Sequence, residues 1–235
     1  NRYYKFYGLN LTVETLDGLI KHNGPVLNKI YEYKKILKQN LLKDMIAFNS
    51  YPSLEAQVAA ISDDIAYNNH DLEDGLRAGL FTIKKFSSIP AISKLINKHL
   101  QNIKKFRREI IISQIVRDLI NLMVVDVIKT TNINLKKINP QSINNIYNHN
   151  GLIVDFSDKM KKIDKQIKDF LHRNMYNHSK VIVNTNKGKK IVNDLFAYML
   201  KNPKKYINIS HFKNENDERV IADFIAGMTD RYAIN

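Results

Sequence analysis

Three side chains that can take part in chemistry recur at four-residue spacing: Asp63, Tyr67 and Asp71. In a helix of about 3.6 residues per turn, each step of four drifts only about 40° around the axis, so two carboxylates and a phenol line one stripe. Carboxylates at the buried end of a helix need a cation to offset desolvation, and oxygen ligands suit Mg²⁺ or Mn²⁺. By spacing alone two interpretations are open: a metal-binding stripe, or a solvent-facing acidic one, which is commoner.

The adjacent pair His70 and Asp71 has the residue types of a metal-binding His-Asp dyad. Such a dyad needs further histidine ligands to complete a site. None of the other histidines stands in a comparable acidic, helical context. The pair therefore does not by itself predict a metal centre.

The elements that must position the stripe are predicted from apolar spacing, which is helical almost throughout and indicates an all-α fold. Thr12 caps a helix to about residue 23, and Gly24 and Pro25 separate it from the next, at 26–37. Ser53 caps the helix that carries the stripe, with Glu55 in its first turn.

The second half of the chain is also predicted to be helical. Pro90 opens a helix that continues with little break into 106–129, and the polar residues 132–150 form a loop with one short helix. Residues 156–170 present a narrow apolar seam at 4-3 spacing, formed by Phe156, Met160, Ile163, Ile167 and Phe170. A short strand or turn is considered only at 181–183, and helices follow at 188–201 and 217–232, separated by Pro203.

Composition excludes several classes of protein. The 235 residues contain no cysteine, which excludes disulfide scaffolds, thiolate zinc sites and cysteine nucleophiles. No apolar run is long enough to span a membrane, and we expect a cytoplasmic protein. Of the net charge of +14, residues 1–100 supply +3 and residues 101–235 supply +11. A basic half suits nucleic acid or phosphates, but we favour solvated lysine-rich helix faces.

Four blocks, in order, resemble the deoxyguanosine triphosphate triphosphohydrolase-like family of the HD-domain phosphohydrolase superfamily. The block at 55–79, EAQVAAISDDIAYNNHDLEDGLRAG, is similar to the family's late active-site motif. The others are YGLNLTVETLDGLIKHNGP at 7–25, REIIISQIVRDLI at 108–120 and AGMTDRYA at 226–233. The resemblance implies the C-terminal part of an HD-type helical domain at 1–100, followed by an associated helical domain at 101–235.

The resemblance implies an activity and residue roles. Family members hydrolyse a dNTP to the deoxynucleoside and inorganic triphosphate, with a metal held by His, a His-Asp pair and a later Asp, which matches Asp63. Tyr67 matches the tyrosine that packs against the deoxyribose, and Asp71 the carboxylate that helps to hold the 3′-hydroxyl. On this alignment His70 is not a metal ligand, and we expect it to serve packing or orientation.

Further substrate contacts are predicted at Lys21 and His22, although both residue types are also favoured at a helix C-terminus. Arg231 is a candidate nucleotide contact as well, with a structural ion pair as the simpler interpretation. We also expect a homo-oligomer.

In the family, the first His and the His-Asp pair precede the block matched at 7–25. The resemblance therefore implies that three of the four metal ligands are not in this sequence, and that the chain is either the C-terminal part of a longer protein or a decayed relative. Its catalytic groups are unknown. The alternative function is a non-catalytic helical module that binds nucleotides or nucleic acid. A His followed by a His-Asp pair upstream would favour the enzyme.

Overall fold

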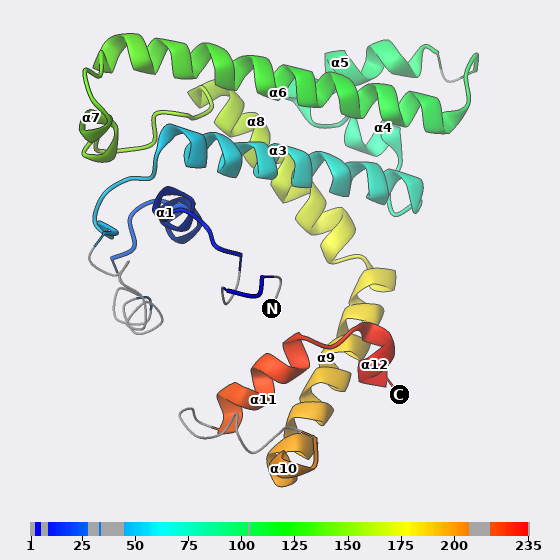
Figure 1. Ribbon diagram of the computed structural model, residues 1–235. Helices are drawn as coiled ribbons and strands as arrows, with labels where there is room; N and C mark the ends of the chain where they lie inside the picture. The colour runs from blue at the N-terminus through cyan, green and yellow to red at the C-terminus, as the bar shows by residue number, and fades with distance from the viewer. Residues whose placement is uncertain are drawn as a thin grey trace. The chain divides into compact units, whose positions relative to one another are not determined.

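The computed structural model describes residues 3–5, 9–27, 33, 45–102, 104–206 and 217–234, and every regular element in this part of the chain is a helix (Figure 1). This confirms the all-α prediction. The chain divides into two compact units, Asn1–Leu171 and His172–Asn235.

The first unit is built on two long helices, α3 (Leu54–Arg77) and α6 (Arg108–Ile138), which lie side by side in opposite directions (Figure 1). Near one end Arg77 Nη2 donates to Ser113 Oγ at 3.1 Å. Midway, Asn69 Nδ2 donates to Met123 Sδ at 3.3 Å. The buried apolar residues between these helices include Ile65, Leu72, Leu76, Ile112, Ile115 and Leu119.

Shorter helices surround this pair: α1 (Val13–Lys21), α4 (Ile83–Phe86), α5 (Pro90–Leu100), α7 (Ile143–Tyr147) and α8 (Asp158–Leu171). The predicted seam at 156–170 is confirmed, because all five of its apolar residues are buried. At its end the ring of Phe170 meets Phe81 and Phe86 edge-on, with ring centroids 4.9 and 5.2 Å away.

The second unit consists of a π-helical turn (His172–Tyr176), α9 (Ser179–Lys201), α10 (Pro203–Tyr206), α11 (Asp217–Ala226) and α12 (Asp230–Ile234). Helix α11 packs on α9 around Met199, Val220 and Ile221. The side chains of Phe196 and Phe224 pack against this small core.

Several boundaries differ from prediction. Helix α6 continues to Ile138, where Asn139 ends it in the left-handed conformation (φ 46°), so only the later part of 132–150 is loop. The strand considered at 181–183 is wrong, because these residues lie inside α9. A turn at Gly227 divides the helix predicted at 217–232. Most of the helix predicted at 26–37 lies outside the described residues.

The compact units divide after Leu171, not near Gln101, where the charge balance changes. The reason is packing, since α6 lies beyond Gln101 yet runs along α3. None of the described helices has the length and apolar content that crossing a membrane requires.

Candidate functional site

The stripe lies on one continuous helix, as predicted. Ser53 caps α3 by accepting a hydrogen bond from the Ala56 N–H, and the helix continues well past Asp71. Tyr67 is 60% exposed and Asp63 is also exposed, whereas Asp71 is half-buried. The expectation that the acidic residues at this point are buried is wrong for Asp63, because α3 buries its other side.

That other side fixes the rotation of α3 about its axis. Leu72 is fully buried, and the amide of Asn68 donates to Asp164 Oδ1 on α8 at 3.2 Å. The amide of Asn69 donates to the Ile65 carbonyl at 2.8 Å as well as to the Met123 sulfur. The fold loses stability when a buried amide loses its hydrogen-bond partner, so this side of α3 cannot turn outward. The stripe therefore stays on the opposite side of α3, where Asp63 and Tyr67 are exposed.

Asp63 lies on the wall of a groove of about 800 Å³ between α1, α3 and α7. The two longer helices approach closely there, and a Cβ added to Gly18 would lie only 3.0 Å from the Cβ of Ala56. The lining residues include Glu14, Leu19, His22, Glu55, Asp63 and Tyr147. Neither Tyr67 nor Asp71 lines this groove.

The groove carries negative charge. Glu14, Glu55 and Asp63 all line it, and among the described residues no lysine or arginine does. Burial, followed by the negative charges of Asp17, Glu14 and Glu55, raises the pKa of the Tyr147 hydroxyl above its ordinary value. Such a wall attracts a cation and repels a bare triphosphate.

His22 is the histidine that shares the groove with Asp63. Its Nδ1 lies 2.8 Å from the Leu19 carbonyl oxygen, and its Nε2 lies 2.9 Å from the side-chain amide of Asn23. These partners set the tautomer, with a proton on Nδ1 and an acceptor at Nε2. The predicted position of His22 beside a substrate fits this groove, but its acceptor nitrogen is already paired.

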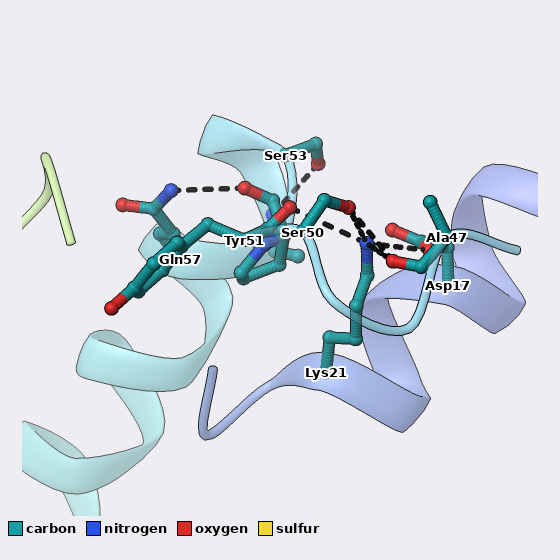
Figure 2. A network of polar contacts seen from close by, with 9 residues as sticks. Asp17, Lys21, Ala47, Ser50, Tyr51, Ser53 and Gln57 are labelled. Atoms are coloured by element: carbon teal, nitrogen blue, oxygen red, sulfur yellow. Dashed lines mark hydrogen bonds and ion pairs between the residues drawn. The ribbon is translucent and has the colours of Figure 1, made fainter. Parts of the chain in front are cut away.

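Lys21 is buried within the first unit and does not line the groove. Its side chain is 1% exposed, and its ammonium pairs with Asp17 Oδ1 at 2.8 Å. It also donates to Ser50 Oγ at 2.8 Å and to the carbonyls of Ala47 and Tyr51, each at 3.3 Å (Figure 2). Since an ammonium has three donors, none is left for a substrate. The structure thus assigns Lys21 to the joint between α1 and the 47–51 segment.

Gln57 forms a second joint beside this one, which sequence reasoning missed. Its amide donates to the Pro52 carbonyl at 2.9 Å (Figure 2). Its side-chain oxygen accepts from the backbone N–H groups of Ile153 and Val154, at 2.8 and 3.1 Å. Gln57 is buried, and a long polar side chain in the first turn of α3 was the available signal.

Lys168 was also missed, and it connects α8 to the residue next to Asp63. Its ammonium lies 2.9 Å from Asp164 Oδ2 and 3.5 Å from Asp64 Oδ2. Burial acts to lower the pKa of Lys168, but the hydrogen bonds and negative charges of Asp164 and Asp64 outweigh it and raise that pKa. Asp64 is therefore partly neutralised, whereas Asp63 forms no ion pair with another described residue.

The described residues do not complete a metal site. They contain no group of three or more His, Asp and Glu side chains placed to hold an ion. The carboxylate oxygens of Asp63 are the type of ligand that a divalent cation prefers, and the groove is acidic. The number of ligands among the described residues is nevertheless too small to hold an ion. Arg231 is exposed on α12 of the second unit, and His70 is exposed on α3 beside α6.

Comparison with known proteins gives relatives along the whole chain. Residues 154–235 match the phosphohydrolase-associated domain. A deoxyguanosinetriphosphate triphosphohydrolase-like protein of Pelagibacter ubique is 49% identical over 100% of this chain and 63% of its own length. Proteins with the same name from Bartonella henselae and Rickettsia typhi are 40% and 39% identical over 99% of this chain.

The chain spans 60% and 61% of the lengths of the Bartonella and Rickettsia proteins, so it covers less than two thirds of each of the three relatives. The matched region at 154–235 contains all of α8 and all of the second unit. From end to end the chain is therefore similar in sequence to the deoxyguanosinetriphosphate triphosphohydrolase-like proteins, as its four blocks predicted, and its residues 154–235 are similar to the phosphohydrolase-associated domain.

Proposed function

We propose that the protein hydrolyses a deoxynucleoside triphosphate, dGTP or another dNTP, to the deoxynucleoside and inorganic triphosphate. Whole-chain similarity to proteins with that name supports the reaction class. The observation that carries the proposal is Asp63, an exposed carboxylate on the wall of an acidic groove, on a helix whose rotation is fixed from its other side.

Asp63 would supply one oxygen ligand to a divalent ion, Mg²⁺ or Mn²⁺. The remaining ligands would come from outside the described residues, since those described cannot complete the set. This arrangement accounts for an acidic wall in a nucleotide site, because a cation is needed between Glu14 or Glu55 and a substrate with about four negative charges.

The sugar would lie along the open side of α3. The exposed ring of Tyr67 would pack against the deoxyribose, where a 2′-hydroxyl would collide, and Asp71 would help to hold the 3′-hydroxyl. His22, from the groove wall, is proposed as a further nucleotide contact. Arg231 is proposed separately as a nucleotide contact of the second unit.

The test compares two neighbouring aspartates in protein of the full length of the relatives. Asp63→Asn should lower Mg²⁺- or Mn²⁺-dependent release of triphosphate from dNTPs by about 100-fold or more, because the loss of a ligand carboxylate costs metal affinity. Asp64→Asn makes the same chemical change one residue away and should retain most of the activity, because Asp64 pairs with Lys168. Equal activity in the wild type and Asp63→Asn would refute the assignment.

A second substitution tests sugar recognition. Tyr67→Ala should bring the kcat/KM values for a dNTP and the matching NTP closer together, by about tenfold, since the ring would no longer exclude the 2′-hydroxyl. Tyr67→Phe keeps the ring and should keep the discrimination. If Tyr67→Ala discriminates as well as the wild type does, the ring does not contact the sugar.

The alternative is a non-catalytic helical module that binds nucleotides or nucleic acid through the basic residues 101–235. It predicts nucleotide binding without release of triphosphate, and binding that is indifferent to Asp63→Asn. Chelation of divalent metal followed by its restoration separates the two, because only the enzyme should lose and regain turnover.

A further inference from the structure

Two tyrosines and a lysine meet on the surface of the second unit, where α9 is followed by α10 (Figure 1). The ammonium of Lys205 donates to the hydroxyl oxygen of Tyr198 at 3.3 Å, and the Tyr206 hydroxyl donates to the same oxygen at 3.4 Å. The ammonium also lies over both rings, 5.9 Å from the centroid of Tyr198 and 5.4 Å from that of Tyr206. We call these three residues the Tyr198 cluster.

The end of α9 brings the three residues together. Asn202 leaves the helical conformation, and its side-chain amide donates to the Tyr198 carbonyl at 3.3 Å. Pro203 then begins α10, as proline commonly does at the first position of a helix. Lys205 and Tyr206 follow on this short helix and reach back to Tyr198, seven and eight positions earlier. The Tyr198 cluster is therefore built within one turn of the chain.

The cluster has hydrogen-bond donors that its own contacts do not use. An ammonium has three N–H donors, and Lys205 directs one of them at Tyr198. The Tyr198 oxygen accepts twice, but its own O–H has no acceptor among the described residues. Both rings are partly exposed, so a dissolved molecule can reach these three donors. Lys21 is the opposite case, because all of its donors are used inside the fold.

The cluster stabilises negative charge on an oxygen. The hydrogen bond from Tyr206, followed by the hydrogen bond and the positive charge of Lys205, lowers the pKa of the Tyr198 hydroxyl below its ordinary value. A lowered pKa means that these neighbours favour the anionic form of that oxygen. Contacts with Tyr198 and then Tyr206 raise the pKa of Lys205, so its ammonium stays charged at neutral pH. An oxygen of a bound anion would be stabilised by the same neighbours.

The surroundings of the cluster are positive as well. Helix α9 contains five lysines and one acidic residue, Asp194. None of the ion pairs between described residues involves a lysine of α9 or Lys205. Lys168 of α8 differs, because it pairs with Asp164. Lys201 lies one turn after Tyr198, so a second uncompensated ammonium is close to the cluster.

We propose that the Tyr198 cluster binds the terminal phosphate of a small anion. Such a phosphate has three strong acceptor oxygens and a charge of about −1.5 to −2, which matches three unused donors and one ammonium. A lysine is a compact charge with rotatable donors, whereas a planar carboxylate is matched best by the fork of an arginine. A phosphodiester has fewer free oxygens and a single charge, so a terminal phosphate fits the cluster better than a nucleic-acid backbone does.

This site is distinct from the groove beside Asp63, which belongs to the first unit. That groove is acidic and repels a triphosphate that carries no metal. Binding of inorganic triphosphate in the absence of divalent metal therefore reports on the Tyr198 cluster. The inference does not depend on the proposed hydrolysis.

The first experiment titrates the chain with inorganic triphosphate, in about 150 mM salt with a chelator, and follows the phosphorus NMR signals. The wild type should bind with a Kd below about 1 mM. Lys205→Gln should weaken binding by about tenfold or more, because it removes the ammonium. Lys189→Gln removes the same charge from α9, about 180° around the helix from Tyr198, and should change the Kd by less than about twofold. A wild type that binds no triphosphate, or equal losses in the two variants, would overturn the proposal.

The second experiment removes a hydroxyl and keeps its ring. Tyr198→Phe should weaken triphosphate binding by about threefold or more, because one donor is lost. Tyr232→Phe makes the same change at an exposed tyrosine of α12 and should bind as the wild type does. Both substitutions are on the surface, and circular dichroism should show unchanged helix content. Full affinity in Tyr198→Phe would contradict the role of its hydroxyl.

Competition identifies the chemical group that the cluster recognises. Orthophosphate and a nucleoside monophosphate should both displace triphosphate, whereas the free nucleoside should not. Displacement by the nucleoside would show that the rings bind a base, which would refute the phosphate assignment. An oligothymidylate without terminal phosphates that binds more tightly than triphosphate, and loses this affinity in Lys205→Gln, would assign the cluster to a nucleic-acid backbone instead. All three experiments measure binding without turnover, so their failure would leave the hydrolase proposal intact.

Discussion

The two sides of α3 have opposite properties. On the closed side Leu72 is fully buried, and each buried amide, at Asn68 and Asn69, has a hydrogen-bond partner on the chain. On the open side Asp63 and Tyr67 are exposed, and Asp63 borders the groove. The closed side determines where α3 lies, and the open side offers functional groups that packing does not use.

This contrast separates two kinds of polar residue on one helix. A buried amide must be paired because it has lost its water, so Asn68 and Asn69 are explained by the fold. An exposed carboxylate needs no partner for stability. Substitutions on the closed side should therefore change stability, and those on the open side should change activity alone.

The largest expected effect on stability comes from truncation on the closed side. Leu72→Ala should lower the free energy of unfolding by about 2–5 kcal/mol, because it leaves a cavity between α3 and α6. Tyr67→Ala, on the open side of the same helix, should change it by less than about 0.5 kcal/mol. Urea denaturation followed by circular dichroism measures both. Similar losses in the two variants would show that the open side is also a packing surface.

A smaller effect is expected where α1 meets α3. Gly18→Ala should destabilise the first unit by about 1 kcal/mol, because the new methyl group forces the two helices apart. Gly188→Ala in α9 is the control, since its Cβ meets nothing within 4 Å. This control should stabilise α9 by about 0.5–1 kcal/mol through helix propensity. Thermal unfolding of both variants measures the difference, and a stabilising Gly18→Ala would show that the helices separate without cost.

The smallest effect concerns Lys168, which ties α8 to Asp64 and Asp164. Its pKa is raised above the usual 10.5 in the folded chain, so its contribution to stability is complete below that value and is lost as the pH rises through the folded pKa. Lys168→Met should therefore lose less stability than the wild type as the pH rises above about 10.5. Tyr147→Phe serves as a control, because Tyr147 titrates in the same range and its pKa is also raised. Identical pH profiles for the wild type and Lys168→Met would contradict the ion pair.

Local chemistry made much of the fold predictable. The caps at Thr12 and Ser53, the helix start at Pro90 and the seam at 156–170 depend on residues within a few positions of one another. The stripe itself followed from spacing, since a helix fixes which residues share a side. The boundary between the two compact units was less predictable, because the distribution of charge along the sequence does not reveal that α6 packs on α3.

Lys21 and Lys168 show the limit of sequence reasoning. Lys21 was a candidate substrate contact or a cation favoured at a helix C-terminus, yet its partners Ala47, Ser50 and Tyr51 lie more than 25 positions away. Lys168 looked like one of several solvated lysines of its helix, yet it pairs with Asp64, about 100 positions away. Only long-range packing distinguishes such lysines from their neighbours.

The sequence by itself determined that the chain is helical, where α3 begins, that Asp63, Tyr67 and Asp71 share one of its sides, and which proteins the chain resembles. These features depend on the helical repeat and on residue identity, both of which are local. Only the tertiary structure decided that Asp63 borders an acidic groove, whereas the ammonium of Lys21 is buried and fully hydrogen-bonded. It also decided which sides of α3 and α6 are buried in the described part of the chain, because burial depends on which distant helices meet.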